Sequence, residues 1–314
     1  MKQRIAVLTG AGVSAESGLG TYRDNGGLWD NYDPMVVASA EGWARNPGLV
    51  LDFYNMQRAK LRDTRPNEAH RLIAQLEERY TVDVITQNVD NLHERAGSTH
   101  VVHLHGEATK VRPENTCNDY DGFSEKYVID IGYDEVHLGD KAPNGAQYRP
   151  HIVFFGEAVP KIERAVELVA AADIVLIVGT SLQVYPAAGL YRYARPEAPI
   201  YLIDPADVQI IDSRVHHIKQ VATEGMREFV GLLKYFATFA SAKRKRRCKA
   251  MIIVPVKEGE NIERALKKFK RKFEKTGAVR EMRARKNFQK PSELRRVAKQ
   301  KAIYVQHLRL QDEQ

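Results

Sequence analysis

The sequence predicts an α/β protein built on a doubly wound parallel sheet and followed by a basic helical extension. Apolar runs typical of buried strands alternate with segments of helical periodicity between residues 5 and 203. This alternation indicates parallel strands joined by crossover helices. The 314 residues carry a net charge of +8 that is concentrated near the C-terminus, so a second part of different character is expected.

The first predicted strand is followed by a glycine-rich turn. Residues 5–8 are apolar, Gly10 and Gly12 come directly after them, and a helix is predicted to begin near Ser14. Backbone N–H groups at such a turn bind pyrophosphate, so this stretch predicts a nucleotide site. An ordinary dehydrogenase would have a second strand ending in an acidic residue about 20 positions further on. Residues 22–29 are instead typical of a loop, which argues against hydride transfer.

Helices and four further strands follow. Residues 34–78 have helical periodicity that is interrupted at Pro66 and Asn67. Strands are predicted over residues 82–86, 101–104, 174–178 and 200–203.

Glycine and polar residues occur at the ends of the predicted strands, and four of these sets are considered together. The sets are Gly10 to Ser14, Gln87 to Asp90, Gly179 to Ser181, and Ile203 with Asp204. Ligands of open parallel sheets bind beyond the carboxyl ends of the strands, so we expect these sets to line one crevice. Any one set is compatible with ordinary turn chemistry, but the coincidence of four favours a ligand site.

Five motifs occur in a fixed order along the first three quarters of the chain. They are Gly-Ala-Gly-Val-Ser-Ala-Glu-Ser-Gly from residue 10, Thr-Gln-Asn-Val-Asp-Asn-Leu-His from 86, His-Leu-His-Gly-Glu from 103, Val-Phe-Phe-Gly-Glu from 153, and Gly-Thr-Ser from 179. This set resembles the sirtuins, a family of NAD-consuming protein-lysine deacylases. The resemblance runs from about Arg4 to Leu233. It implies a Rossmann-like domain over residues 1–237, with a small module inserted at about 110–149.

The resemblance also implies roles for individual residues. NAD would be held by Gly10, Ala11, Gly12, Ser14, Glu16, Thr21, Tyr22, Arg23, Trp29, Gln87, Asn88, Val89, Asp90, Gly179, Thr180, Ser181, Ile203, Asp204 and Ala222. His105 and Asn88 would be catalytic. An acyl-lysine protein or peptide would be bound by Tyr54, Gln57, Val153, Phe154, Phe155 and Gly156, the last four by strand-like pairing.

The implied reaction requires a base. The acyl oxygen attacks the anomeric carbon of the nicotinamide ribose as nicotinamide leaves, and a ribose hydroxyl must then be activated to attack the resulting imidate. Histidine suits this step because its unperturbed pKa lies near the operating pH. His105 follows a predicted strand and is the expected base, whereas His93, His103 and His151 are expected to be structural or surface residues.

The inserted module departs from the family pattern in its cysteines. Many sirtuins hold a structural zinc ion there with four cysteines, but this stretch contains Cys117 alone, and Cys248 lies far outside it. One thiolate cannot make a tetrahedral sulfur site, so we expect no metal.

A second departure concerns the acyl group. Sirtuins that prefer dicarboxylic acyl groups present Tyr-x-x-Arg on a helix, whereas here Tyr54 is followed at that spacing by Gln57, with Arg58 one position late. A shift of one helical position rotates a side chain by about 100°. We therefore expect acetyl-lysine to be preferred to succinyl- or malonyl-lysine.

The C-terminal part is strongly basic. From Lys243 onward there are 24 Lys and Arg against 8 Asp and Glu, a net of +16; since the whole chain has 48 and 40, residues 1–242 have 24 and 32, a net of −8. Residues 238–250 are interpreted as a basic linker. Beyond it, apolar residues form only narrow helical stripes, so residues 251–314 are expected to order mainly on a partner.

Such dense Lys and Arg favour contact with a phosphate backbone. The stretch from Pro255 to Gly277, with Tyr304-Val305-Gln306 near the end, resembles small-subunit bacterial ribosomal protein twenty-one. This resemblance implies that residues 251–314 bind ribosomal RNA of the small subunit.

Three functional hypotheses remain open. The leading one is an NAD-dependent protein-lysine deacetylase that carries a ribosome-binding extension. The alternatives are a structural ribosomal protein with a passenger sirtuin domain, and an NAD hydrolase that uses water as the acceptor. The motif at 153–157 favours the deacylase, and intact His105 and Asn88 argue against a passenger. Two cysteines and the absence of a long apolar run predict a cytoplasmic protein with no membrane partner.

Overall fold

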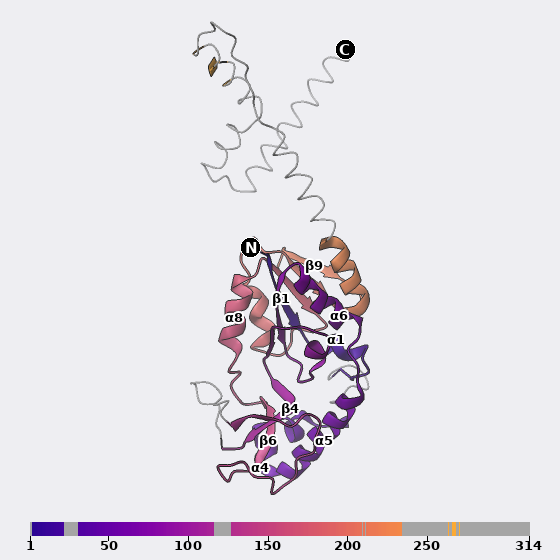
Figure 1. Cartoon of the computed structure of the whole chain (residues 1–314), viewed down its shortest axis with the longest axis vertical. Coiled ribbons are helices and arrows are strands. Elements are labelled where there is room, and N and C mark those ends of the chain that lie inside the picture. Colours follow the sequence, from indigo (N-terminus) through magenta and orange to yellow (C-terminus); the bar gives the residue numbers. More distant parts are fainter. Residues whose placement is uncertain are drawn as a thin grey trace. The chain divides into compact units, whose positions relative to one another are not determined.

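The computed structural model describes residues 2–21, 31–115, 127–208, 210, 212–233 and the four positions 263, 266, 267 and 270. The chain divides into two compact units, Met1–Tyr235 and Phe236–Gln314. In the second unit the four described residues are helical, and each of them is exposed. The expected linker at 238–250 and the rest of the basic segment lie outside the described residues. The architecture given below is that of the first unit (Figure 1).

Six parallel strands form the main sheet. In spatial order they are β3 (Val101–His103), β2 (Thr81–Thr86), β1 (Arg4–Thr9), β7 (Ile174–Val178), β8 (Ile200–Ile203) and β9 (Val215–Ile218). The predicted parallel α/β sheet is confirmed, and all five predicted strands belong to it. The order reverses between β1 and β7, which is the point where open parallel sheets bind their ligands. The sixth strand, β9, contains two histidines and has no apolar run that would predict it.

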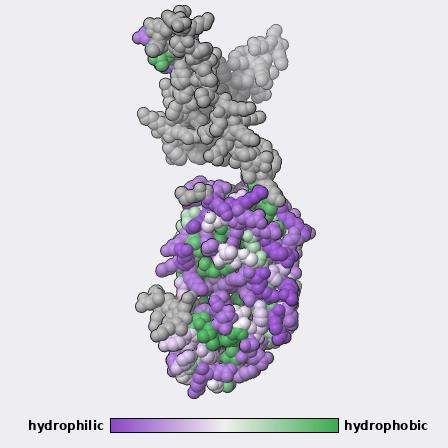
Figure 2. All heavy atoms as spheres, in the orientation of Figure 1, coloured by the Kyte–Doolittle hydropathy of each residue, from purple (hydrophilic) through white to green (hydrophobic). Residues whose placement is uncertain are grey.

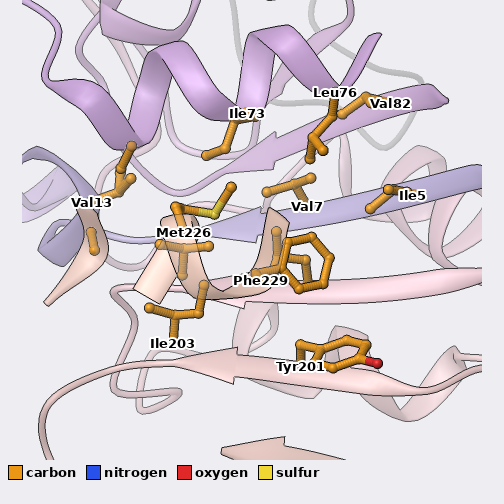
Figure 3. Packing of buried hydrophobic residues seen from close by; sticks show 14 of the residues in the cluster. Ile5, Val7, Val13, Ile73, Leu76, Val82, Tyr201, Ile203, Met226 and Phe229 are labelled. Atoms are coloured by element: carbon orange, nitrogen blue, oxygen red, sulfur yellow. The ribbon is translucent and has the colours of Figure 1, made fainter. Parts of the chain in front are cut away.

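Helices pack on both faces of the sheet because the strands are apolar on both faces. On the face shown in Figure 3, Ile5 and Val7 of β1 meet Ile73 of α6 (Glu68–Gln75) and Met226 and Phe229 of the helix at residues 222–233.

The opposite face buries the alternate residues of the same strands. Ala6 and Leu8 belong to a separate core that includes Leu168 of α8 (Ile162–Ala171) and Leu190 of η3 (Ala187–Tyr193).

Further helices and a small antiparallel sheet also belong to the unit. The helices are α1 (Gly12–Ala15), α3 (Pro34–Val37), α4 (Ala40–Arg45), α5 (Pro47–Asp63), η1 (Leu76–Glu78) and α7 (Leu92–Arg95); the second sheet has the order β5 (Ile129–Asp130), β4 (Gly106–Pro113), β6 (Tyr148–Ile152). The predicted helical stretch is divided because Asp33, Ser39 and Asn46 each accept a backbone N–H and so cap a new helix. Figure 2 shows a mainly hydrophilic face, with apolar residues gathered over β4 and β6.

Arg58 joins α5 to the inserted module. It is 0% exposed. Its guanidinium donates to the carbonyl oxygens of Asp134 at 2.9 Å and Ala108 at 3.2 Å, and also to the side-chain oxygen of Asn55. Asn55 in turn exchanges two hydrogen bonds of 3.0 Å with the backbone of Val136. Burial lowers the pKa of Arg58 to about 10. Arg58 therefore has a structural role, because its hydrogen bonds hold the inserted module against α5.

Two expected absences can be examined only in part. Among the described residues there is no group of three or more His, Cys, Asp or Glu that could hold a metal ion. Cys117 lies outside those residues, so the expected lack of zinc stays a prediction. None of the helices in the described part of the chain is both long and apolar enough to cross a membrane.

Replacing Arg58 should destabilise the unit. Arg58→Met leaves buried carbonyl oxygens without their donor, and we expect the free energy of unfolding to fall by about 3 kcal/mol. The matched control is Arg62→Met on the same helix, where the arginine side chain is 62% exposed; this change should stay within about 0.5 kcal/mol. Urea unfolding of both variants measures the difference, and equal effects would contradict the role given to Arg58.

Candidate functional site

A cavity of about 860 Å³ opens at the carboxyl ends of β1, β2, β7 and β8. Cavities that bind small molecules range from about 300 to 1,000 Å³, so it can hold a ligand of substantial size. Residues from all four predicted sets line it, including Gly10, Gln87, Gly179 and Asp204. The cavity therefore occupies the switch point of the sheet.

Most of the site residues expected from the sequence lie on this wall. They are Gly10, Ala11, Gly12, Glu16, Thr21, Tyr54, Gln57, Gln87, Asn88, Val89, His105, Val153, Phe154, Phe155, Gly156, Gly179, Thr180, Ser181, Ile203, Asp204 and Ala222. Tyr22, Arg23 and Trp29 lie outside the described residues.

The glycines of the wall allow two loops to touch. Gly12 N–H donates to the Gly179 carbonyl at 2.8 Å. Gly179 has a φ of +60°, and a Cβ there would lie 2.3 Å from the backbone nitrogen of Val13. No side chain fits that gap, so the residue after β7 must be glycine for the turn after β1 to reach its position.

Ser14 and Asp90, which were also expected to bind NAD, are not among the residues that line the cavity but lie behind Asn88, and their role in binding NAD stays a prediction. The Asn88 amide donates to the Gly10 carbonyl and to Ser14 Oγ, both at 3.1 Å, and Ser14 Oγ donates to Asp90 at 2.9 Å. The second Asp90 oxygen accepts the Leu92 N–H at 3.0 Å. Burial raises the pKa of Asp90. The two residues hold Asn88 in place from behind.

His105 is held as a neutral base. Its Nδ1 lies 3.0 Å from the Gln87 carbonyl oxygen. A carbonyl only accepts, so Nδ1 carries the proton and Nε2 is the basic nitrogen. Burial lowers the pKa of His105, and the bond to Gln87 opposes that shift only partly. The imidazole is therefore neutral near pH 7 and able to accept a proton.

The Val153–Gly156 stretch is fixed by its own chain. The Val153 N–H donates to the His105 carbonyl at 3.0 Å, and the Phe155 N–H donates to the Ala38 carbonyl at 2.8 Å. The Phe154 N–H donates to the Glu157 carboxylate at 2.9 Å. Any strand-like pairing with a peptide at this stretch must therefore use carbonyl oxygens or Gly156.

Two arginines hold Glu157 beneath that stretch. Arg149 lies 2.7 Å from one carboxylate oxygen and Arg112 lies 3.3 Å from the other. Burial raises the pKa of Glu157, but the hydrogen bond and charge of Arg149 outweigh burial and lower it overall. The Arg149 guanidinium also lies 3.9 Å from the centre of the Phe154 ring. These contacts fix Phe154 against the cavity.

Four further histidines, His70, His93, His103 and His151, are buried. The sequence left a structural or a surface position open for the last three, and the structure excludes the surface position. Burial lowers the pKa of His70 to about 4 and that of His151 to about 3. His93 lies with its ring 4.9 Å from that of His70, and burial lowers its pKa well below 6.5. His103 is different: burial opposes its charge, but the 2.7 Å contact with Glu94 outweighs burial and raises its pKa.

Several wall residues were not anticipated. Residues 183–186 and Val221 line the cavity, as do Ala38 and Phe53. The first group begins two positions after the expected set at 179–181, and Val221 precedes Ala222, so closeness in sequence was an available signal. Ala38 and Phe53 belong to helical segments, where the sequence does not indicate which residues face a ligand.

Two models of known protein families match parts of this chain. The Sir2 family model matches residues 10–186, which is more than half of the chain. The chain belongs to the Sir2 family. A second family model, Ribosomal protein S21, matches residues 253–307, so both resemblances seen in the sequence are confirmed.

Curated sirtuin relatives cover the first unit. An NAD-dependent protein deacylase of Bacteroides thetaiotaomicron is 53% identical over 234 residues, which is 74% of this chain and 98% of that protein. An NAD-dependent protein deacylase of Helicobacter pylori is 48% identical over 226 residues, 69% of this chain and 93% of that protein.

Solved sirtuin structures have the same fold. A Sir2 homologue in complex with NAD has a TM-score of 0.64 at 34% identity, over 74% of this chain and 90% of that one. A Sir2 protein with a deacetylated p53 peptide and 3′-O-acetyl ADP-ribose has a TM-score of 0.60 at 28% identity, over 72% of this chain and 92% of that one.

The buried neutral histidines predict a loss of stability in acid. The pKa of His70 is about 4 when folded against an ordinary 6.5. Its contribution to stability is therefore full above pH 6.5 and is lost as the pH falls toward 4, by up to about 3 kcal/mol. The unfolding free energy is measured at about pH 7.5 and at about pH 4.5. His70→Gln should reduce the difference between these two values by the contribution of His70. The exposed His100→Gln control should keep the whole difference; if both variants kept it, His70 would not be its source.

Proposed function

We propose that this sirtuin is an NAD-dependent protein-lysine deacylase with a preference for acetyl-lysine, and that its basic extension binds RNA of the small ribosomal subunit. The main support for the enzymatic activity is His105, a neutral base on the wall of a large cavity at the switch point of the sheet. The two relatives named above as NAD-dependent protein deacylases support the same activity. A cytoplasmic location suits both activities.

The cavity fits NAD as a co-substrate. Its volume is about 860 Å³, and its wall combines the turn at 10–12, the loop at 179–181, Gln87 and Asn88. These groups would hold NAD, which supplies the ADP-ribosyl acceptor and releases nicotinamide. Amide side chains suit ribose and carboxamide groups because they donate and accept hydrogen bonds. The likeness to a Sir2 homologue–NAD complex supports this assignment.

His105 would take the proton of a ribose hydroxyl on Nε2. The Gln87 carbonyl fixes the tautomer, and burial keeps the ring neutral at physiological pH. The fixed stretch at 153–156 would present the acyl-lysine beside this base, because the Val153 N–H is bonded to the His105 carbonyl.

The wall disfavours a negatively charged acyl group. Tyr54 and Gln57 line the cavity, whereas Arg58 is buried among carbonyl groups elsewhere. Among the described wall residues there is no Lys or Arg. A distal carboxylate would find no cation on this part of the wall, so a short neutral acyl group such as acetyl fits better.

The extension would act as a separate RNA-binding part. We assign the catalytic domain to residues 1–237, the linker to 238–250 and the RNA-binding segment to 251–314. The match of residues 253–307 to the Ribosomal protein S21 family and the net charge of +16 from Lys243 onward support this division.

Replacing the base should abolish turnover but not binding. His105→Ala should reduce deacetylation of an acetyl-lysine peptide by at least about 100-fold, as expected for loss of a general base, and should still bind NAD. Mass spectrometry of the products and calorimetric titration with NAD measure the two effects. His100→Ala, an exposed histidine, is the control. Parental turnover by His105→Ala would exclude the proposed mechanism.

Position 57 should determine the acyl preference. The parent should process an acetyl peptide at least as efficiently as a succinyl peptide. Gln57→Arg should shift that ratio toward succinyl by about tenfold, because it places a guanidinium three residues after Tyr54. Gln57→Met tests for a purely steric effect and should not favour succinyl. A parent that prefers succinyl tenfold would mean that another cation reaches the carboxylate.

RNA binding should be electrostatic and confined to the extension. The full chain should co-sediment with small ribosomal subunits, and its affinity should fall linearly on a log–log plot against salt, by about one power of salt per phosphate neutralised. A chain ending at residue 242 should not co-sediment and should keep its peptide turnover. Binding indifferent to salt, or equal sedimentation of the two chains, would remove the proposed role of the extension.

A further inference from the structure

The cavity wall is acidic in its described part. The carboxylates that line it are those of Glu16, Glu157 and Asp204, and no Lys or Arg accompanies them among the described wall residues. Glu157 is paired with two arginines behind the wall, whereas Glu16 is bonded to the neutral Thr223. Glu16 and Asp204 belong to the set expected to hold NAD, and no cation of the described wall offsets them, so a positively charged substrate segment is favoured at this cavity over a negatively charged one.

The chain itself contains such a segment. Residues 243–314 include 13 lysines within a net charge of +16, whereas residues 1–242 have a net charge of −8. Lys245 lies within five consecutive basic residues, at 243–247. Lys267 is among the described positions and is exposed. One chain thus contains both a lysine-rich segment of positive net charge and a catalytic part of negative net charge.

We propose that acyl-lysines of residues 243–314, in the same chain or a second copy, are substrates of this cavity. This inference rests on the proposed deacylase function. In each turnover the amide bond between lysine Nζ and the acyl carbon breaks. N-acetyl-lysine, NAD and water give lysine, nicotinamide and O-acetyl-ADP-ribose, and the freed amine takes up a proton.

The reaction would control the binding of RNA by the extension. Acetylation removes the charge of a lysine, so that lysine no longer neutralises a phosphate. Deacetylation restores the charge. Covalent linkage keeps the lysines near the cavity at any dilution, and a chain from residue 233 to Lys267 can extend to at most about 110 Å. The enzyme would thereby keep its own extension competent to bind RNA.

The test uses the full chain with acetyl-lysine placed at Lys245 or at Lys267 during synthesis. After addition of NAD, mass spectrometry follows the acetyl group, and a neutral acetyl-lysine peptide of unrelated sequence is measured in parallel. The acetyl group should be lost from at least one of the two positions faster than from the peptide, by about tenfold in low salt, with the advantage shrinking as salt is added. A rate independent of protein concentration identifies reaction within one chain, and a proportional rate identifies reaction between copies.

Two controls distinguish failure of this inference from failure of the proposed deacylase function. Acetyl-lysine at Lys60, which is exposed on α5, should be retained because that helix is part of the folded unit. The His105→Ala chain should retain the acetyl group at every position. Loss from the peptide but from neither Lys245 nor Lys267 would overturn this inference and leave the deacylase function intact. Loss from neither the peptide nor the chain would overturn the deacylase function itself.

Discussion

The close approach of two backbone turns determines the geometry of the catalytic unit. The turn after β1 and the loop after β7 meet at Gly12 and Gly179, at a distance where no Cβ fits. Their contact brings the ends of two neighbouring strands together at the point where the sheet reverses its order. The cavity opens beside this contact, beyond the carboxyl ends of β1, β2, β7 and β8. The hydrogen bond between Gly12 and Gly179 and the lack of room for a Cβ together set the position of the wall at this point.

A buried polar layer then makes the wall rigid. Asn88 faces the cavity but is fixed through Ser14 and Asp90, which do not line it. His105 is fixed in a similar way by a carbonyl group, and Phe154 by a carboxylate held between arginines. Asn88, His105 and Phe154 are thus each oriented by a hydrogen bond to a neighbouring residue. Such preorganisation is valuable because the groups need not reorganise during a reaction.

The sequence predicted the main sheet well because buried parallel strands are continuous apolar runs, as at residues 174–178. It failed at β9, where His216 and His217 interrupt any such run, and at β4 and β6, whose partners lie far apart in sequence. Motifs located most of the wall. They did not separate Asn88, which lines the cavity, from Asp90, which lies behind it, because a motif records which residues occur together and not which way each one faces.

The neighbouring positions 57 and 58 on α5 have separate tasks. One residue faces the cavity and the next holds the inserted module through buried carbonyl groups. Helical geometry separates the two tasks by about 100°, so mutation at one position leaves the other task untouched. A change at position 57 can then alter the cavity wall without removing the buried hydrogen bonds of Arg58, since no single residue serves both needs. The register of this helix thereby keeps variation at the cavity wall independent of the contacts that hold the inserted module.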